Sequence, residues 1–231
     1  MNHQRYLGLE LSGAKNAKTT IAVLEYYPKE KKVFLLDIHA GIGADQTVNS
    51  DEALIDTILD HSKGSTNMKM GVSVPLTLPP CLLCNRKTCN AKNMCNTPEV
   101  KWMHSFWQRH AQTKAKRPVS KKTARQSDFF TPYTQRPVEL WLKYEVMNHI
   151  PQKIRFELDE TLGGNKAPLT ARMYFLQRHL HAFQMHEVLP KLTVALLMPS
   201  LKLTFRTLRM YRSLEDGAFA RQTILERMCE H

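Results

Sequence analysis

The stretch KMGVSVPLTLPPCLLCNRKTCNAKNMCNTPEVKWM, Lys69–Met103, decides the fold because it joins three kinds of structure. It begins with a short apolar run, Met70–Val74, which predicts a parallel strand buried on both faces. A proline turn follows, and then four of the five cysteines fall within fifteen residues. Thr97-Pro98-Glu99 supplies an N-cap, a proline at the first helical position and an acid in the first turn. The rest of the chain is therefore expected to pack beside a strand, a cysteine-rich metal-binding loop and a helix.

Three strands and a helix are predicted ahead of this stretch. Arg5–Leu11, Thr19–Tyr27 and Lys32–Ala40 are rich in β-branched, aromatic and aliphatic residues and are joined by polar turns, which predicts an antiparallel meander. Asn49 or Ser50 is expected to cap a helix to about residue 61, with two acids in its first turn. Three antiparallel strands, a crossover helix and a fourth strand form the opening of the ribonuclease H-like fold.

The second half of the chain predicts helices and one further strand. Helices are expected from Pro137 and from Pro168, and Gln184–Leu189 is interpreted as the fifth strand. Residues 191–231 are expected to be helical, with breaks near Pro199 and Ser213. We therefore predict one α/β domain over residues 1–231, a ribonuclease H-like mixed five-stranded sheet flanked by helices. It would carry a cysteine-rich metal-binding insertion at 76–97 and a mobile basic loop at 111–127.

The charge balance of the chain favours a polyanionic partner. Its 231 residues include 33 Lys and Arg against 21 Asp and Glu, a formal net charge of +12. Such an excess is typical of proteins that bind nucleic acid or acidic membrane surfaces, although a basic protein without such a partner is also compatible with it. The N-terminus has no apolar signal region, and the longest apolar run, Val194–Met198, is too short to cross a bilayer. A cytoplasmic protein that does not use a membrane is expected.

The four clustered cysteines predict a metal site. Cys81, Cys84, Cys89 and Cys95 have the spacing C-x2-C-x4-C-x5-C, and a reducing cytoplasm favours metal over disulfides. A tetrahedral zinc ion takes four such ligands, and a C-x2-C pair brings two thiolates from one turn to the ion. An iron–sulfur cluster of the 4Fe-4S type takes the same four ligands, so spacing alone leaves both open.

Basic residues gather in and after the cysteine segment. Lys and Arg contact phosphates without reading sequence, so this region predicts salt-sensitive nucleic-acid binding. Trp102 and Phe106 lie four apart on the expected helix and are interpreted as core residues. The predicted nucleic-acid-binding residues are Arg86, Lys87, Lys92, Lys114, Lys116, Arg117, Lys121, Lys122 and Arg125.

Several segments, taken in order, resemble a family of predicted nucleases with a ribonuclease H-like fold. They are GLELSG (8–13), VSVPLTLP (72–79), TPYTQRPVE (131–139), GGNKAPLTAR (163–172), HEVLP (186–190) and EDGAFA (215–220). The resemblance implies metal-dependent hydrolysis of phosphodiesters in nucleic acid, because clustered carboxylates hold two Mg²⁺ or Mn²⁺ ions in that fold.

The resemblance also implies which acids form the catalytic site. Carried over by position, they are Glu10 on the first strand, Glu187 on the fifth strand and Asp216 at the last helix. Two positions depart from the family pattern, since Glu10 stands in place of Asp and Ser73 replaces the carboxylate of the fourth strand. The alternative is therefore a catalytically inactive binding or adaptor module that keeps the fold, the cysteine site and the basic residues.

Overall fold

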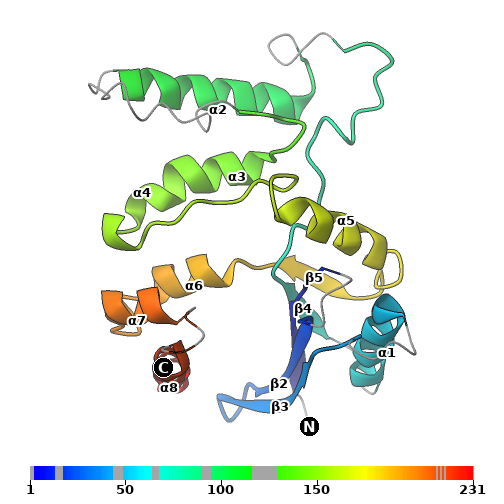
Figure 1. The fold of residues 1–231 in the computed structure, drawn as a ribbon, viewed down its shortest axis with the longest axis vertical. Coiled ribbons are helices and arrows are strands. Elements are labelled where there is room, and N and C mark those ends of the chain that lie inside the picture. Colours follow the sequence, from blue (N-terminus) through cyan, green and yellow to red (C-terminus); the bar gives the residue numbers. More distant parts are fainter. Residues whose placement is uncertain are drawn as a thin grey trace. The chain divides into compact units, whose positions relative to one another are not determined.

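The first strand, β1 (Gln4–Glu10), lies at the centre of the sheet in the computed structural model of the chain. It pairs antiparallel with β2 (Thr20–Tyr27) on one side and parallel with β4 (Lys69–Val72) on the other. β3 (Lys32–Ala40) continues the sheet antiparallel to β2, and β5 (Gln184–Glu187) continues it parallel to β4. The order is therefore β3-β2-β1-β4-β5 (Figure 1). The predicted α/β class, with a mixed five-stranded sheet flanked by helices, is confirmed.

The structure describes residues 3–13, 18–43, 49–63, 68–89, 95–115, 130–211, 213, 215 and 217–230, and the side chains of 111–115 are outside this description. Within these residues, no helix is both long enough and apolar enough to cross a lipid bilayer.

Two helices cover one face of the sheet. α1 (Ser50–Ser62) and α5 (Lys166–Leu176) pack on the alternate side chains of the strands that point to this face. The Asn49 side chain accepts a hydrogen bond from the backbone N–H of Asp51 at 3.1 Å, which confirms the predicted cap of α1. The resulting core contains Leu7, Leu9, Ile21, Val23, Leu54, Ile58, Met70, Val72, Met173 and Leu176.

The chain divides into two compact units. Unit 1 consists of residues 1–83 and 159–188 and holds the sheet with α1 and α5. Unit 2 consists of residues 84–158 and 189–231 and is helical in its described part. Its helices are α2 (Pro98–Ala115), α3 (Pro137–Trp141), α4 (Met147–His149), α6 (Pro190–Leu197), α7 (Phe205–Met210) and α8 (Gly217–Cys229), with a π-helical turn at Leu142–Val146 and a 3-10 turn at Gln152–Ile154.

Unit 2 has several small apolar clusters in place of one large core. Met103 and Phe106 of α2 pack with Leu140 of α3 and Tyr144 of the π-helical turn. A second cluster joins α4 and the 3-10 turn to α6, and a third lies between α8 and the segment after α6. The breaks predicted near Pro199 and Ser213 are confirmed as the gaps that separate α6, α7 and α8.

Two predictions for α2 are corrected. The helix continues to Ala115, five residues into the predicted basic loop, and residues 116–127 of that loop lie outside the described residues. Ala, Gln and Lys have high helix propensity, which explains why the helix extends into this polar run. Phe106 is buried as predicted, but Trp102 is 38% exposed. Trp102 instead stacks on the Phe106 ring from the solvent side, with ring centroids 4.6 Å apart.

Candidate functional sites

Glu10 and Ser73 lie next to each other across β1 and β4. The parallel register pairs Leu9 with Val72, and the Ser73 N–H donates to the Leu9 carbonyl at 3.1 Å. Glu10 and Ser73 are therefore the next two residues along neighbouring strands. Ligands of open α/β sheets bind beyond the carboxyl ends of parallel strands, which is where these two residues stand.

Glu187 lies on the opposite face of the sheet from Glu10. The register aligns Glu187 with Val72 and Leu9, and aligned residues of paired strands point to the same face. This is the face that packs on α1 and α5, whereas Glu10 is one position further along β1 and points to the other face. The Glu187 carboxylate accepts a hydrogen bond from the Leu76 backbone N–H at 3.2 Å. Asp216, the third predicted acid, lies outside the described residues.

The Ser73 side chain is buried without a hydrogen-bond partner in the described part of the chain. Ser73 is 8% exposed and its Oγ contacts no donor or acceptor there, while its carbonyl accepts from Lys166 Nζ at 3.2 Å. A buried hydroxyl without a partner is unfavourable by about 1–3 kcal/mol. The position where the resemblance expects a carboxylate thus holds an unsatisfied polar group.

The four cysteines of the predicted metal site lie in a segment without helix or strand in its described residues. Cys81 and Cys95 are half-buried, Cys84 and Cys89 are exposed, and the four do not form a close group. A hydrogen bond from the Thr97 side chain lowers the pKa of the Cys95 thiol, with smaller contributions in the same direction from the Thr97 backbone and the Arg86 charge. Thiolate is the form that binds metal, so Cys95 is chemically suited to its predicted role.

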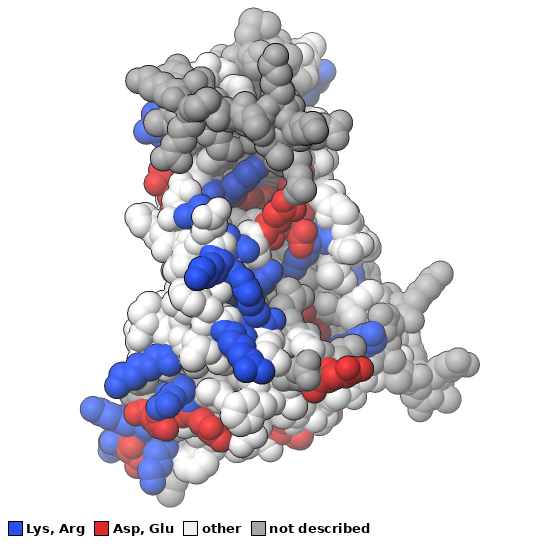
Figure 2. All heavy atoms as spheres, turned by 60° about the vertical axis from the view of Figure 1, so that its left-hand side comes forward, with Lys and Arg blue, Asp and Glu red and all other residues white. Residues whose placement is uncertain are grey.

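Most of the predicted nucleic-acid-binding side chains lie outside the described residues. Arg86 and Lys87 are described, and both are exposed in the loop after the second cysteine. Lys114 lies on α2, where the backbone alone is described. The others fall in the undescribed segments, namely Lys92, Lys116, Arg117, Lys121, Lys122 and Arg125. Figure 2 shows further Lys and Arg side chains spread over the face it draws, with Asp and Glu among them.

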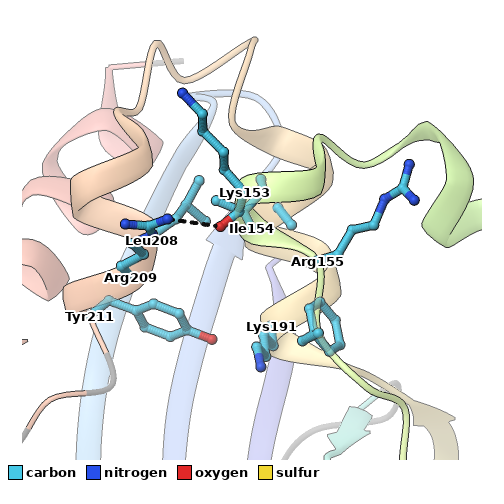
Figure 3. A pocket seen from close by; sticks show the side chains of 9 residues that line it. Lys153, Ile154, Arg155, Lys191, Leu208, Arg209 and Tyr211 are labelled. Atoms are coloured by element: carbon cyan, nitrogen blue, oxygen red, sulfur yellow. Dashed lines mark hydrogen bonds between the residues drawn. The ribbon is translucent and has the colours of Figure 1, made fainter. Parts of the chain in front are cut away.

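A pocket of about 210 Å³ in unit 2 is lined by four basic residues that the sequence did not predict as a site. Its lining comes from the 3-10 turn, the two residues after it, α6, and the end of α7. The Tyr211 ring points toward Lys191, while the Lys153 and Arg155 side chains extend away from the Tyr211 ring (Figure 3). The lining residues are Lys153, Ile154, Arg155, Phe156, Lys191, Ala195, Leu208, Arg209 and Tyr211.

The nine lining residues include four Lys or Arg and no acid. Arg155 donates to the carbonyls of Ile150 and Asn148 at 2.8 and 3.0 Å, and Arg209 donates to the Lys153 carbonyl at 3.4 Å. These acceptors fix the guanidinium groups without neutralising them, since carbonyl oxygens carry no formal charge. Lys191 Nζ lies 4.2 Å from the centre of the Phe156 ring. The lining therefore combines four cations with two aromatic rings, and Lys191 is the cation that lies over one of them.

Comparisons with family models, with curated proteins and with solved structures found no match to this chain. The class that the fold defines is an α/β protein with a mixed five-stranded sheet, joined to a helical unit with a basic pocket.

The pocket cations had no local signal in the sequence. They lie at residues 153–155, 191 and 209, and no spacing rule links a 3-10 turn to two later helices. The composition did predict an excess of positive charge, but packing within unit 2 decides where four of those charges meet.

Proposed function

We propose that this protein binds single-stranded nucleic acid through the basic pocket of unit 2. The observation that carries the proposal is the lining itself, with four Lys and Arg side chains, two aromatic rings and no carboxylate. Positive grooves combined with aromatic side chains are typical of proteins that bind single strands, because phosphates meet cations and bases meet rings. The formal net charge of +12 adds long-range attraction to the same partner.

The size of the pocket supports a polymer in preference to a small molecule. A volume of about 210 Å³ lies below the ~300–1,000 Å³ typical of small-molecule sites. It suits a phosphate group and part of its nucleotide, while the rest of the strand would contact the surface beyond. Arg86 and Lys87, together with the predicted basic residues up to Arg125, would supply further phosphate contacts.

The test is the salt dependence of binding to labelled single-stranded DNA and RNA, with duplex DNA as a second arm. Each phosphate contact adds about 0.7 to the slope of log K against log salt for single strands, so four contacts in the pocket give about −2.8 and contacts outside the pocket make the slope steeper. The double variant Lys191→Ala/Arg209→Ala should reduce the slope by about 1.4 and weaken binding for every sequence tested. Measurement by fluorescence anisotropy over a range of salt concentrations gives both quantities.

The matched control removes two positive charges elsewhere. Lys29 and Lys32 are exposed at the β2–β3 turn of unit 1, so Lys29→Ala/Lys32→Ala changes the net charge equally. The control should retain the wild-type slope. Equal loss in both double variants would show that the net charge, and not the pocket, determines binding. Preference for duplex DNA over single strands would contradict the role of the aromatic rings.

The second candidate function is metal-dependent hydrolysis of nucleic acid by a ribonuclease H-like unit 1. It is favoured by the exposed Glu10 carboxylate at the end of β1, beside the end of β4. Of the three acids that the resemblance implies, Glu10 is the candidate ligand of Mg²⁺ or Mn²⁺ in unit 1, because Glu187 points to the opposite face of the sheet and Asp216 belongs to unit 2. Cleavage of labelled DNA and RNA with either ion should be lost in Glu10→Gln. Absence of cleavage by the wild-type chain with both ions leaves the binding module as the function.

The four cysteines are proposed to bind zinc, with a 4Fe-4S cluster as the alternative. Four thiolates suit either group, and the lowered pKa of the Cys95 thiol favours a bound metal. Metal analysis and an absorption spectrum of protein purified with and without oxygen distinguish the two. Loss of the bound metal in Cys84→Ser and Cys89→Ser, with retention in Cys229→Ser, would support the predicted ligands. Equal metal content in all three variants would refute them.

A further inference from the structure

Asp37, His39 and His61 bring three metal-binding atoms to one point in unit 1. His39 Nε2 lies 2.6 Å from His61 Nε2 and 3.0 Å from Asp37 Oδ2, and the remaining Nε2–Oδ2 separation is 4.0 Å. Across the described ranges, this is the one group of three or more His, Cys, Asp or Glu side chains whose ligand atoms lie this close together. None of the three was predicted from the sequence.

The backbone of β3 directs two of these side chains toward α1. Asp37 aligns with Val23 and His39 with Ile21, and both partners belong to the face that packs on the helices. The register shifts between Val23 and Leu24, so Leu36 is an extra residue in β3, and bulges of this kind re-aim the side chains beside them. Asp37 and His39 are two apart and therefore point to the same face.

His61 is held in place from the last turn of α1. Its backbone carbonyl accepts a hydrogen bond from Arg5 Nη1 at 2.7 Å, and Arg5 is in turn paired with the buried Glu25. Asp37 is also oriented, because its Oδ1 accepts from the Ile38 N–H at 2.7 Å and leaves Oδ2 facing the imidazoles. The three ligands thus come from a paired strand and an anchored helix end, with their neighbours fixing their directions.

Hydrogen bonding within the group does not satisfy all three side chains. An imidazole nitrogen carries either one proton or one lone pair, so His39 Nε2 cannot serve both Asp37 and His61 fully. In the described part of the chain no Lys or Arg pairs with Asp37, whose ion-pair partners are these two histidines. With neutral imidazoles the carboxylate charge is therefore not balanced, and a cation at the centre would meet three lone pairs at once.

The separations suit a tetrahedral ion after small movements. Metal–ligand bonds of ~2.0–2.1 Å at tetrahedral angles place ligand atoms about 3.3 Å apart. The observed separations of 2.6, 3.0 and 4.0 Å lie on both sides of that value, so no side chain needs to move by more than about 0.7 Å. The side chains are 47%, 36% and 24% exposed for Asp37, His39 and His61, which leaves room for water on the open side of the ion.

We propose that Asp37, His39 and His61 bind one divalent transition-metal ion of the zinc class, with water at the remaining position. Three protein ligands and an open position are the arrangement of catalytic zinc sites, and neutral imidazole suits zinc among the available metals. Bound water at such a site is a Lewis-acid-activated nucleophile at neutral pH. The site is separate from the four cysteines and does not depend on nucleic-acid binding.

The test measures how many zinc ions the full chain binds in equilibrium dialysis against Zn²⁺, and compares the wild type with single-residue variants. His39→Gln and His61→Gln should each bind one equivalent less than the wild type, or bind it more than ~100-fold more weakly, because losing even an outer-sphere partner costs about 10–100-fold. The control is His149→Gln, an exposed histidine of α4 in unit 2, which should match the wild type. Zinc bound by the four cysteines contributes equally to the wild type and to these variants, so the difference in stoichiometry between them reports only the histidine site.

A Co²⁺ titration gives a second readout on the same variants. Cobalt at this site has nitrogen and oxygen ligands, so the absorption lost in His61→Gln should lack the sulfur charge-transfer band of a thiolate site. Circular dichroism checks that each variant is folded. Asp37→Asn changes the third ligand, and because the Asp37 side chain is exposed this substitution should not disturb the fold. Wild-type stoichiometry and affinity in His39→Gln, His61→Gln and Asp37→Asn would overturn the proposal and leave a hydrogen-bonded histidine pair.

Discussion

Replacing Ser73 with alanine is predicted to stabilise the protein, against the usual effect of a core substitution. The Ser73 hydroxyl is buried and has no hydrogen-bond partner in the described part of the chain. Burial of such a group costs about 1–3 kcal/mol, and Ser73→Ala removes that cost. The void left by the oxygen costs at most about 0.7 kcal/mol, from ~24 cal/mol per Å³ and the ~30 Å³ share of one water molecule. The expected net gain is therefore about 1 kcal/mol.

Urea unfolding followed by circular dichroism measures this gain. With an m value of ~2 kcal/mol/M, a gain of about 1 kcal/mol raises the midpoint by about 0.5 M. Ser200→Ala is the control, since Ser200 is exposed in the turn after α6 and its substitution should change the stability by less than ~0.5 kcal/mol. A lowered midpoint for Ser73→Ala would refute the reasoning, because it would show that the hydroxyl has a favourable partner. Destabilisation seen only with Mg²⁺ present would identify that partner as a cation or its bound water.

Two further stability predictions follow from unit 1. The Arg5 hydrogen bond lowers the pKa of the buried Glu25 carboxyl, so its stabilisation is present above the unfolded pKa of ~4.3 and is lost as the pH falls through the lower folded pKa. Glu25→Gln should therefore cost about 2 kcal/mol at neutral pH, and this difference should shrink below about pH 4; a difference independent of pH would contradict the ion pair. Gly43 has a φ of +81° and a Cβ there would lie 2.3 Å from Ser50 Cβ. Gly43→Ala should lower the unfolding free energy by about 2 kcal/mol or more, while Gly13→Ala, which meets nothing within 4 Å, should change it little; equal effects in thermal unfolding would refute the steric argument.

The strands and most helix starts could be predicted from the sequence because their signals are local. β3 begins at Lys32 and ends at Ala40 as predicted, because a charged turn precedes the strand and Gly41 follows it. Asn49 and Pro98 mark helix starts through capping chemistry that depends on a few adjacent residues. The predicted end of α2 near residue 110 is wrong because residues 111–115 combine high helix propensity with a polar composition that also suits a loop.

The division into two units and the gathering of functional side chains could not be predicted in this way. Residues 84–158 leave unit 1 and residues 159–188 return to it, so the order of elements along the chain does not reveal the boundary. Asp37 and His39 share a face through the period of a strand, but His61 joins them only because α1 packs on that face. Glu10 and Glu187 are separated by the sheet instead. Glu187 aligns with Leu9, one residue before Glu10, so the two acids that the resemblance places together point to opposite faces.

The basic pocket lies in a different unit from the two sites of unit 1, so nucleic-acid binding at the pocket can be separated from the activities proposed for unit 1. The basic pocket belongs to unit 2, whereas Glu10 and the Asp37–His39–His61 group belong to unit 1. A change at Lys191 should therefore alter nucleic-acid affinity and leave zinc binding at the histidines unchanged. If unit 1 hydrolyses a strand held by unit 2, weaker binding should raise the substrate concentration needed for half-maximal rate without lowering the maximal rate, because uniform binding affects both substrate and transition state. A fall in the maximal rate alone would show that the pocket contacts the reacting phosphate itself.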